Sequence, residues 1–198
     1  MAQIGEKSGS MPKSESRILR NLFRLGTLEA QDIMTPRTVI ASLPHAATVA
    51  EMLDRVANRP FSRLPVTEGD KDTISGFVLR TDVLVASAEG KGSILIGDLK
   101  REIMTVRDNL PLSELFDKFL QEKQHIAIVL DEYGGTTGLL TLEDIVETLI
   151  GIEIIDETDA VVDMRALARE RWKERASAMG IQDGMTTTEI RTDPASTK

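Results

Sequence analysis

The chain repeats itself, and this internal duplication limits the fold more than any other feature. Residues 33–37 return as residues 103–107, and residues 47–66 align with residues 110–129 at a constant offset. Each copy closes on a glycine followed six positions later by an aspartate, Gly76 with Asp82 and Gly138 with Asp144. A repeat of about 60 residues predicts two half-modules that cover each other's apolar faces, because neither has enough core alone.

Composition restricts the classes of protein that this chain can represent. Its 198 residues are 41% hydrophobic, which is enough to bury one sizeable core. The absence of cysteine excludes disulfides and thiolate metal sites, and two histidines are too few for a histidine-rich metal site. A net charge of -8 argues against nucleic acid as a partner, because binding phosphates requires a basic surface. We find no run of about 20 apolar residues that would predict a membrane span.

Each copy predicts the order strand, helix, strand, strand, helix. Thr48 and Glu51 match the capping-box pattern that begins a helix, and Pro60 ends it. Residues 126–130 are apolar throughout, which predicts a strand covered on both faces. The expected elements are strand 39–43, a helix between Thr48 and Pro60, strands 64–66 and 74–79 and helix 81–88, then strand 105–107, helix 112–121, strands 126–130 and 137–140 and helix 142–150.

The expected fold class is α+β, with two subdomains related by a pseudo-twofold axis, each a small mixed sheet with flanking helices. An N-terminal helix leads into them, because residues 14–25 carry apolar side chains at helical spacing. The expected divisions are a leader with this helix over residues 1–26, subdomains over 27–90 and 91–155, and an acidic and charged tail, partly disordered, over 156–198.

The most informative short motif is the pair Thr141 and Asp144, which directly follows a predicted strand. Three residues apart on the first turn of a helix, a hydroxyl and a carboxylate can point to one spot, where the free amides of the helix favour an anion. A carboxylate can accept hydrogen bonds from both vicinal hydroxyls of a ribose. The alternative interpretation is that Thr141 is an N-cap and Asp144 a favourable acidic residue in the first turn.

A second candidate segment lies where the first helix of the earlier copy meets its following strand. There Phe61 offers an aromatic surface to a base, Arg63 offers forked donors to phosphate, and Pro65 closes the pocket. In a pseudo-twofold pairing this segment can face Thr141 and Asp144. The alternatives are core packing for Phe61 and a solvated surface charge for Arg63.

Taken together, these motifs resemble a tandem pair of CBS domains, also called a Bateman module. The resemblance is closest to the cytoplasmic region of the cyclin M and CorC family of magnesium transport proteins, once labelled hemolysin-like, and covers about residues 4–160. The segments that carry it are residues 33–37, 61–66, 131–135, 138–144 and 153–159.

This resemblance implies a regulatory module that binds an adenine nucleotide, ATP or else AMP or ADP, between the copies. Thr141 and Asp144 would hold the ribose, with Leu139 beside them. The resemblance further implies that the base and phosphates would be bordered by Thr35, Val39, Phe61, Ser62, Arg63 and Pro65. Magnesium would be held by the nucleotide phosphates and water, so no protein metal ligand is expected.

The earlier copy departs from this pattern. Leu79 stands where Thr141 does, and His125 and Ile126 replace Ser62 and Arg63. The symmetry-related pocket around Asp82 is therefore expected to be weak or empty, with one nucleotide per chain. The family's membrane-spanning domain is not present ahead of residue 1, so we expect an excised cytoplasmic piece of a membrane protein.

Two other functions remain open at this point. One is an interaction module that dimerises without a small ligand. The other is a metal-dependent nucleotide hydrolase that uses Glu143, Asp144 or the acidic run of residues 153–159, although no catalytic motif is present. We do not expect an enzyme. CBS pairs generally associate as flat homodimers, so a homodimer through the helices near residues 49–56 and 112–120 is expected.

Overall fold

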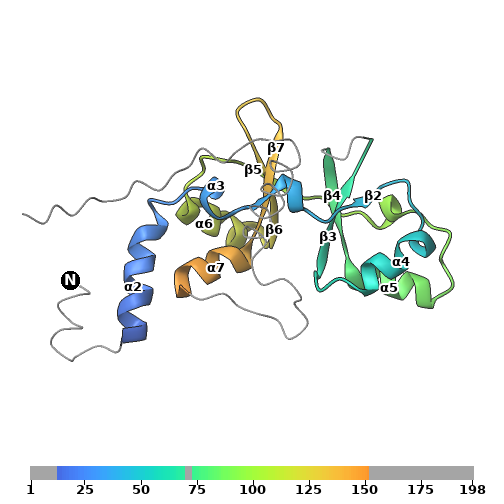
Figure 1. Cartoon of the computed structure of the whole chain (residues 1–198), viewed down its shortest axis with the longest axis horizontal. Helices are drawn as coiled ribbons and strands as arrows, with labels where there is room; N and C mark the ends of the chain where they lie inside the picture. The colour runs from blue at the N-terminus through green and yellow to red at the C-terminus, as the bar shows by residue number, and fades with distance from the viewer. Residues whose placement is uncertain (1–12, 70–72, 152–198) are drawn as a thin grey trace, which may run out of the picture.

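The computed structural model describes residues 13–69 and 73–151; the predicted leader, the acidic run of residues 153–159 and the C-terminal tail lie outside them. Two small mixed sheets lie at the centre, and helices cover the outer side of each (Figure 1). The predicted α+β class with two related subdomains is confirmed. We call residues 43–101 the earlier lobe and residues 104–150 the later lobe.

The earlier lobe is built on a three-stranded sheet in the order β2-β3-β4. Strand β2 runs parallel to β3, and β3 runs antiparallel to β4. Its elements are β2 (Leu43–Pro44), α4 (Val49–Ala57), β3 (Arg63–Thr67), β4 (Ile74–Leu79), α5 (Arg80–Ala88) and the 3-10 helix η2 (Ile96–Leu99). Val49, Leu64 and Val83 are among the fully buried side chains of its core, so helices and sheet share one apolar interior.

The later lobe repeats this plan with a four-stranded sheet in the order β1-β7-β6-β5, in which β1 (Thr35–Pro36) comes from the segment ahead of the earlier lobe. Its own elements are β5 (Met104–Arg107), α6 (Leu112–Glu122), β6 (Ile126–Leu130), β7 (Thr136–Thr141) and α7 (Leu142–Ile150). Strand β6 lies in the middle of the sheet, and its first four side chains are buried. The prediction that this strand is covered on both faces is therefore confirmed.

Local chemistry explains where the helices begin and end. Thr48 caps α4 and forms the predicted capping box with Glu51, since each satisfies a free amide at the start of the helix. Helix α7 ends at Gly151, whose left-handed φ of 73° suits a residue without a Cβ. Helix α5 begins at Arg80, one residue earlier than expected, and no side chain caps its N-terminus.

The extended segment predicted over residues 39–43 forms a strand only at its end, Leu43, and its first residue, Val39, belongs to a 3-10 turn. Pro36, with its φ fixed near -62°, begins the 3-10 turn η1 (Arg37–Val39), and only Leu43–Pro44 form a strand.

The segment that leads into each copy lies on the other lobe. Helix α3 (Ala30–Ile33) and strand β1 (Thr35–Pro36) pack on the later lobe, where β1 pairs with β7 and Ile33 is 5% exposed. In the same way, η2 packs on the earlier lobe, and Ile96 belongs to its core. Because the segment ahead of each copy packs on the other copy, the two lobes are held together by contacts from both segments.

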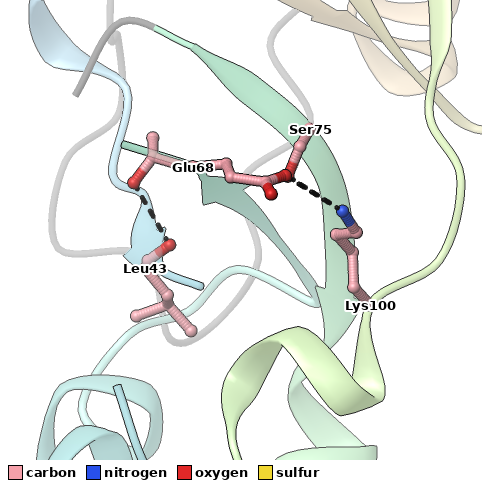
Figure 2. A network of polar contacts seen from close by, with 5 residues as sticks. Leu43, Glu68, Ser75 and Lys100 are labelled. Atoms are coloured by element: carbon pink, nitrogen blue, oxygen red, sulfur yellow. Dashed lines mark hydrogen bonds and ion pairs between the residues drawn. The ribbon is translucent and has the colours of Figure 1, made fainter. Parts of the chain in front are cut away.

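The chain between the copies is held to the earlier lobe by polar contacts as well (Figure 2). Lys100 Nζ donates to Ser75 Oγ at 3.1 Å and lies 3.6 Å from a carboxylate oxygen of Glu68. The hydroxyl of Thr67 donates to the carbonyl of Leu43 at 3.4 Å, which joins β3 to β2. The bond from Lys100 to Ser75 holds residue 100 against β4.

Helix α2 (Lys13–Leu25) confirms the predicted N-terminal helix and stands beside α7 (Figure 1). Leu25 is buried in the core of the later lobe. Asn21 Nδ2 donates to the carbonyl of Leu149 in the last turn of α7, at 3.2 Å. The N-terminal helix is thus attached to the end of the helix that Thr141 begins.

Candidate functional site

Thr141 and Asp144 form a closed hydrogen-bonded ring at the N-terminus of α7. The hydroxyl and the backbone amide of Thr141 both donate to Asp144 Oδ2, each at 2.7 Å. The backbone amide of Asp144 donates back to the Thr141 hydroxyl oxygen at 3.3 Å. The N-cap interpretation is therefore confirmed. The same ring fixes a hydroxyl and a carboxylate side by side at the positive end of a helix.

Strand β1 brings the first candidate residues onto β7, the strand that ends at this ring. Thr35 pairs with Leu139, and η1 contacts β7. The approach is close because position 138 has no side chain: a Cβ there would come within 2.7 Å of the Thr35 carbonyl oxygen. Val39 is 4% exposed, so its side chain belongs to the interior and its backbone is the part that can face a ligand.

The remaining candidates gather around the start of β3 on the earlier lobe. Phe61 is half-buried and packs against the core of that lobe, as its alternative interpretation predicts. Pro65 is buried opposite Phe77, Arg63 is partly exposed, and Ser62 is exposed. The structure thus gathers the candidates into two groups, one around β7 and one around β3, each supplied by a different lobe. That the two groups line one cleft stays a prediction.

Two arginines near these groups were missed by sequence reasoning. Arg80 donates its backbone amide to the Ser62 carbonyl at 2.9 Å and its Nη2 to the Ala57 carbonyl at 2.9 Å. It therefore holds the segment containing Phe61 and Ser62 against the end of α4. Arg101 forms an ion pair with Asp82, with 2.8 Å between Nη2 and Oδ2. Nothing in the local sequence pattern predicts either contact, because both depend on the tertiary fold.

The residues described here offer little to a resident metal ion. Among residues 13–69 and 73–151 there is no group of three or more histidine, aspartate or glutamate side chains placed to hold one. Glu143 is exposed, while Asp144 is bonded within the capping ring. The acidic run that the hydrolase hypothesis also used lies outside the described residues. Within the described part of the chain, no helix combines the length and the apolar character needed to span a bilayer.

Comparison with known proteins identifies the protein family to which this chain belongs. The family model for the CBS domain matches residues 30–89 and 96–151, which correspond to the two copies. The chain belongs to the CBS domain family, as a tandem pair of the kind found in the CorC and CNNM magnesium transport proteins.

Two curated proteins are similar to this chain over most of its length. The UPF0053 protein YhdP of Bacillus subtilis is 41% identical over 77% of this chain and 35% of its own length. The magnesium and cobalt efflux protein CorC of Escherichia coli K12 is 33% identical over 81% of this chain and 56% of its own length. The chain thus spans about half or less of the length of these curated relatives.

Solved structures give the same assignment. The CBS domain of a bacterial CNNM/CorC family Mg²⁺ transporter superposes with a TM-score of 0.72 at 30% identity, covering 78% of this chain and 94% of that one. The CBS domain of the bacterial CNNM/CorC family transporter in complex with ATP superposes with a TM-score of 0.66 at 29% identity, covering 70% of this chain and 98% of that one. A CBS-domain pair from Klebsiella pneumoniae with bound AMP is also similar, with a TM-score of 0.57.

Proposed function

We propose that this chain is a regulatory module that binds an adenine nucleotide, ATP with magnesium, between its two lobes. The observation that carries the proposal is the ring of Thr141 and Asp144 at the end of β7, the strand with which Thr35 pairs, since it places a carboxylate suited to ribose hydroxyls at a helix N-terminus that favours phosphate. The similarity to an ATP-bound CBS domain at 29% identity supports the same ligand.

In this proposal each lobe supplies a different part of the site. Thr141, Asp144 and Leu139 hold the ribose, while Thr35 and the backbone at Val39 border the base and phosphates. From the earlier lobe, Phe61 and Pro65 flank the base, and Ser62 and Arg63 contact the phosphates. The phosphates and water hold magnesium, because this ion keeps much of its hydration shell.

The similarity to CorC and CNNM proteins supports a proposal for the biological setting. We propose that the chain is the cytoplasmic part of a membrane protein that transports magnesium or another divalent cation, and that two copies form a homodimer. Nucleotide would bind one arrangement of the lobes better than another and bias the membrane part through the N-terminal helix α2.

Thermal melting with and without ATP and magnesium tests the ligand. A ligand that binds only the folded state at 100 times its Kd stabilises it by about 2.7 kcal/mol, a rise in Tm of roughly 5–10 °C for a chain of this size. Asp144→Ala and Thr141→Ile should remove most of that rise. The matched control is Asp82→Ala, which deletes the equivalent carboxylate of the earlier lobe. This variant should keep the rise in Tm.

Two results would contradict the proposal. An unchanged Tm with ATP, ADP and AMP, with and without magnesium, would favour a module that dimerises without a small ligand. Conversion of ATP to ADP during the incubation, lost in Asp144→Ala, would favour a hydrolase. Intact ATP after incubation together with a raised Tm is the expected outcome.

A further inference from the structure

The two lobes present equivalent positions that carry different residues. Thr35 pairs with Leu139 on the later lobe. On the earlier lobe, Phe77 is the counterpart of Leu139, and it forms an antiparallel bridge with Arg101. Backbone hydrogen bonds run both ways across this bridge, at 3.0 Å from the Phe77 amide and 2.8 Å from the Arg101 amide. Arg101 therefore takes the place on the earlier lobe that Thr35 takes on the later one. The predicted alignment of residues 33–37 with 103–107 is wrong in the fold, because Val106 pairs with Val129 as Leu43 pairs with Val66, so β5 corresponds to β2.

The glycine before each bridge confirms this equivalence independently. A Cβ added at Gly138 would lie 2.7 Å from the Thr35 carbonyl oxygen, and a Cβ added at Gly76 would lie 2.4 Å from the Arg101 carbonyl oxygen. Both backbones approach a glycine in the same way. Asp82, six residues after Gly76, is accordingly the counterpart of Asp144.

The two aspartates have different partners. Asp144 Oδ2 accepts from the hydroxyl and amide of Thr141. Leu79 stands in the place of Thr141 and offers no hydroxyl, and no side chain caps α5. Instead, Arg101 Nη2 donates to Asp82 Oδ2 at 2.8 Å. A guanidinium supplies donors to the same carboxylate lone pairs that a ribose diol would use, and its hydrogen bond is charge-assisted.

We propose that Arg101 is a built-in competitor that occupies the carboxylate of the symmetry-related site and so restricts nucleotide to one site per chain. This inference rests on the proposed function and deepens it by naming the residue that sets the stoichiometry. Because the two side chains are 53% and 33% exposed, Arg101 weakens binding at Asp82 without sealing the position.

Calorimetric titration of the full chain with ATP and magnesium, and separately with AMP, tests the inference. The unchanged chain should bind one equivalent. Leu79→Thr alone should still bind one, because Arg101 still pairs with Asp82. Leu79→Thr combined with Arg101→Thr should bind a second equivalent, at Asp82, and should keep one equivalent when Asp144→Ala removes the first site.

Each other outcome is decisive. Two equivalents in the unchanged chain or in Leu79→Thr, or only one in the double variant, would overturn the role of Arg101 and leave the proposed function standing. No binding to the unchanged chain would overturn the proposed function as well. Leu79→Thr with Arg101→Ala is the second variant, and a cooperative melt confirms that each protein is folded.

Discussion

At the scale of single residues, positions without a side chain decide how closely segments from different parts of the chain can approach. Gly138 lets the Thr35 backbone and the Met34 side chain lie directly on β7, as Gly76 does for the Arg101 backbone and the Lys100 side chain on β4. The Thr141 and Asp144 ring depends on short-range geometry alone, so the sequence could predict it. The approach of Thr35 depends on residue 138 being glycine.

Gly138→Ala tests this dependence. The new Cβ would lie 2.5 Å from Met34 Sδ and 2.7 Å from a backbone oxygen, so β1 must shift, at a cost of about 1–3 kcal/mol in the free energy of unfolding. Gly26→Ala is the matched control, because the nearest atom there lies at 3.9 Å. Urea denaturation measures both. Equal stabilities of the two variants would show that β1 does not depend on the contact.

The capping box of α4 makes a pH-dependent contribution. Hydrogen bonds from the Thr48 backbone amide, and then from its hydroxyl, lower the pKa of Glu51 below its ordinary value of 4.5. A lowered pKa stabilises the folded state above the ordinary pKa, and this contribution is lost as pH falls through the lowered value. Glu51→Gln should therefore lose less stability than the unchanged chain between about pH 5 and pH 3 in urea titrations. If the free energy of unfolding of both proteins fell equally with pH, the stabilising role of the Glu51 carboxylate would be contradicted.

At the scale of elements, α7 is bonded at both ends. Its N-terminus carries the capping ring, while its last turn receives the Asn21 side chain from α2. A Cβ at Gly151 would lie 2.6 Å from Asn21 Nδ2, so the left-handed glycine also makes room for this contact. The helix that carries the proposed ribose-binding pair is thus the helix that holds α2.

Asn21→Ala and Gly151→Ala should loosen α2. The first removes a side-chain hydrogen bond, at about 0.5–1.5 kcal/mol, and the second adds steric conflict at a residue with positive φ. Arg24→Ala, at an exposed position of the same helix, is the control. Hydrogen exchange of the α2 amides should speed up in the first two variants only. Unchanged exchange in both would show that α2 is held by its apolar contacts alone.

At the scale of the whole molecule, the exchange of leading segments makes each core depend on residues from the other copy of the repeat, since the copies span residues 30–89 and 96–151. Ile33 and Ala30 complete the core of the later lobe, and Ile96 completes that of the earlier lobe. The two lobes are therefore expected to unfold together, because separating them exposes both cores.

Ile33→Ala and Ile96→Ala should each cost about 2–5 kcal/mol in the free energy of unfolding, as buried deletions that leave a cavity. Ile18→Ala on α2, where the side chain is 38% exposed, is the control and should cost far less. A single urea transition with a lowered midpoint is expected in both buried variants. Two separated transitions would show that the lobes fold independently.

The sequence by itself determined the duplication, the α+β class and the order of elements, and strands 74–79 and 126–130 and helix 142–150 match the structure residue for residue. These features depend on local periodicity, capping and turn residues, which neighbouring side chains decide. The pairing of Thr35 with Leu139 and of Arg101 with Asp82 was decided only by the tertiary structure. Neither contact joins neighbours in sequence. The first forms only when β1 packs on the later lobe, and the second only when Arg101 bridges to Phe77 on β4, so both depend on how distant segments pack together.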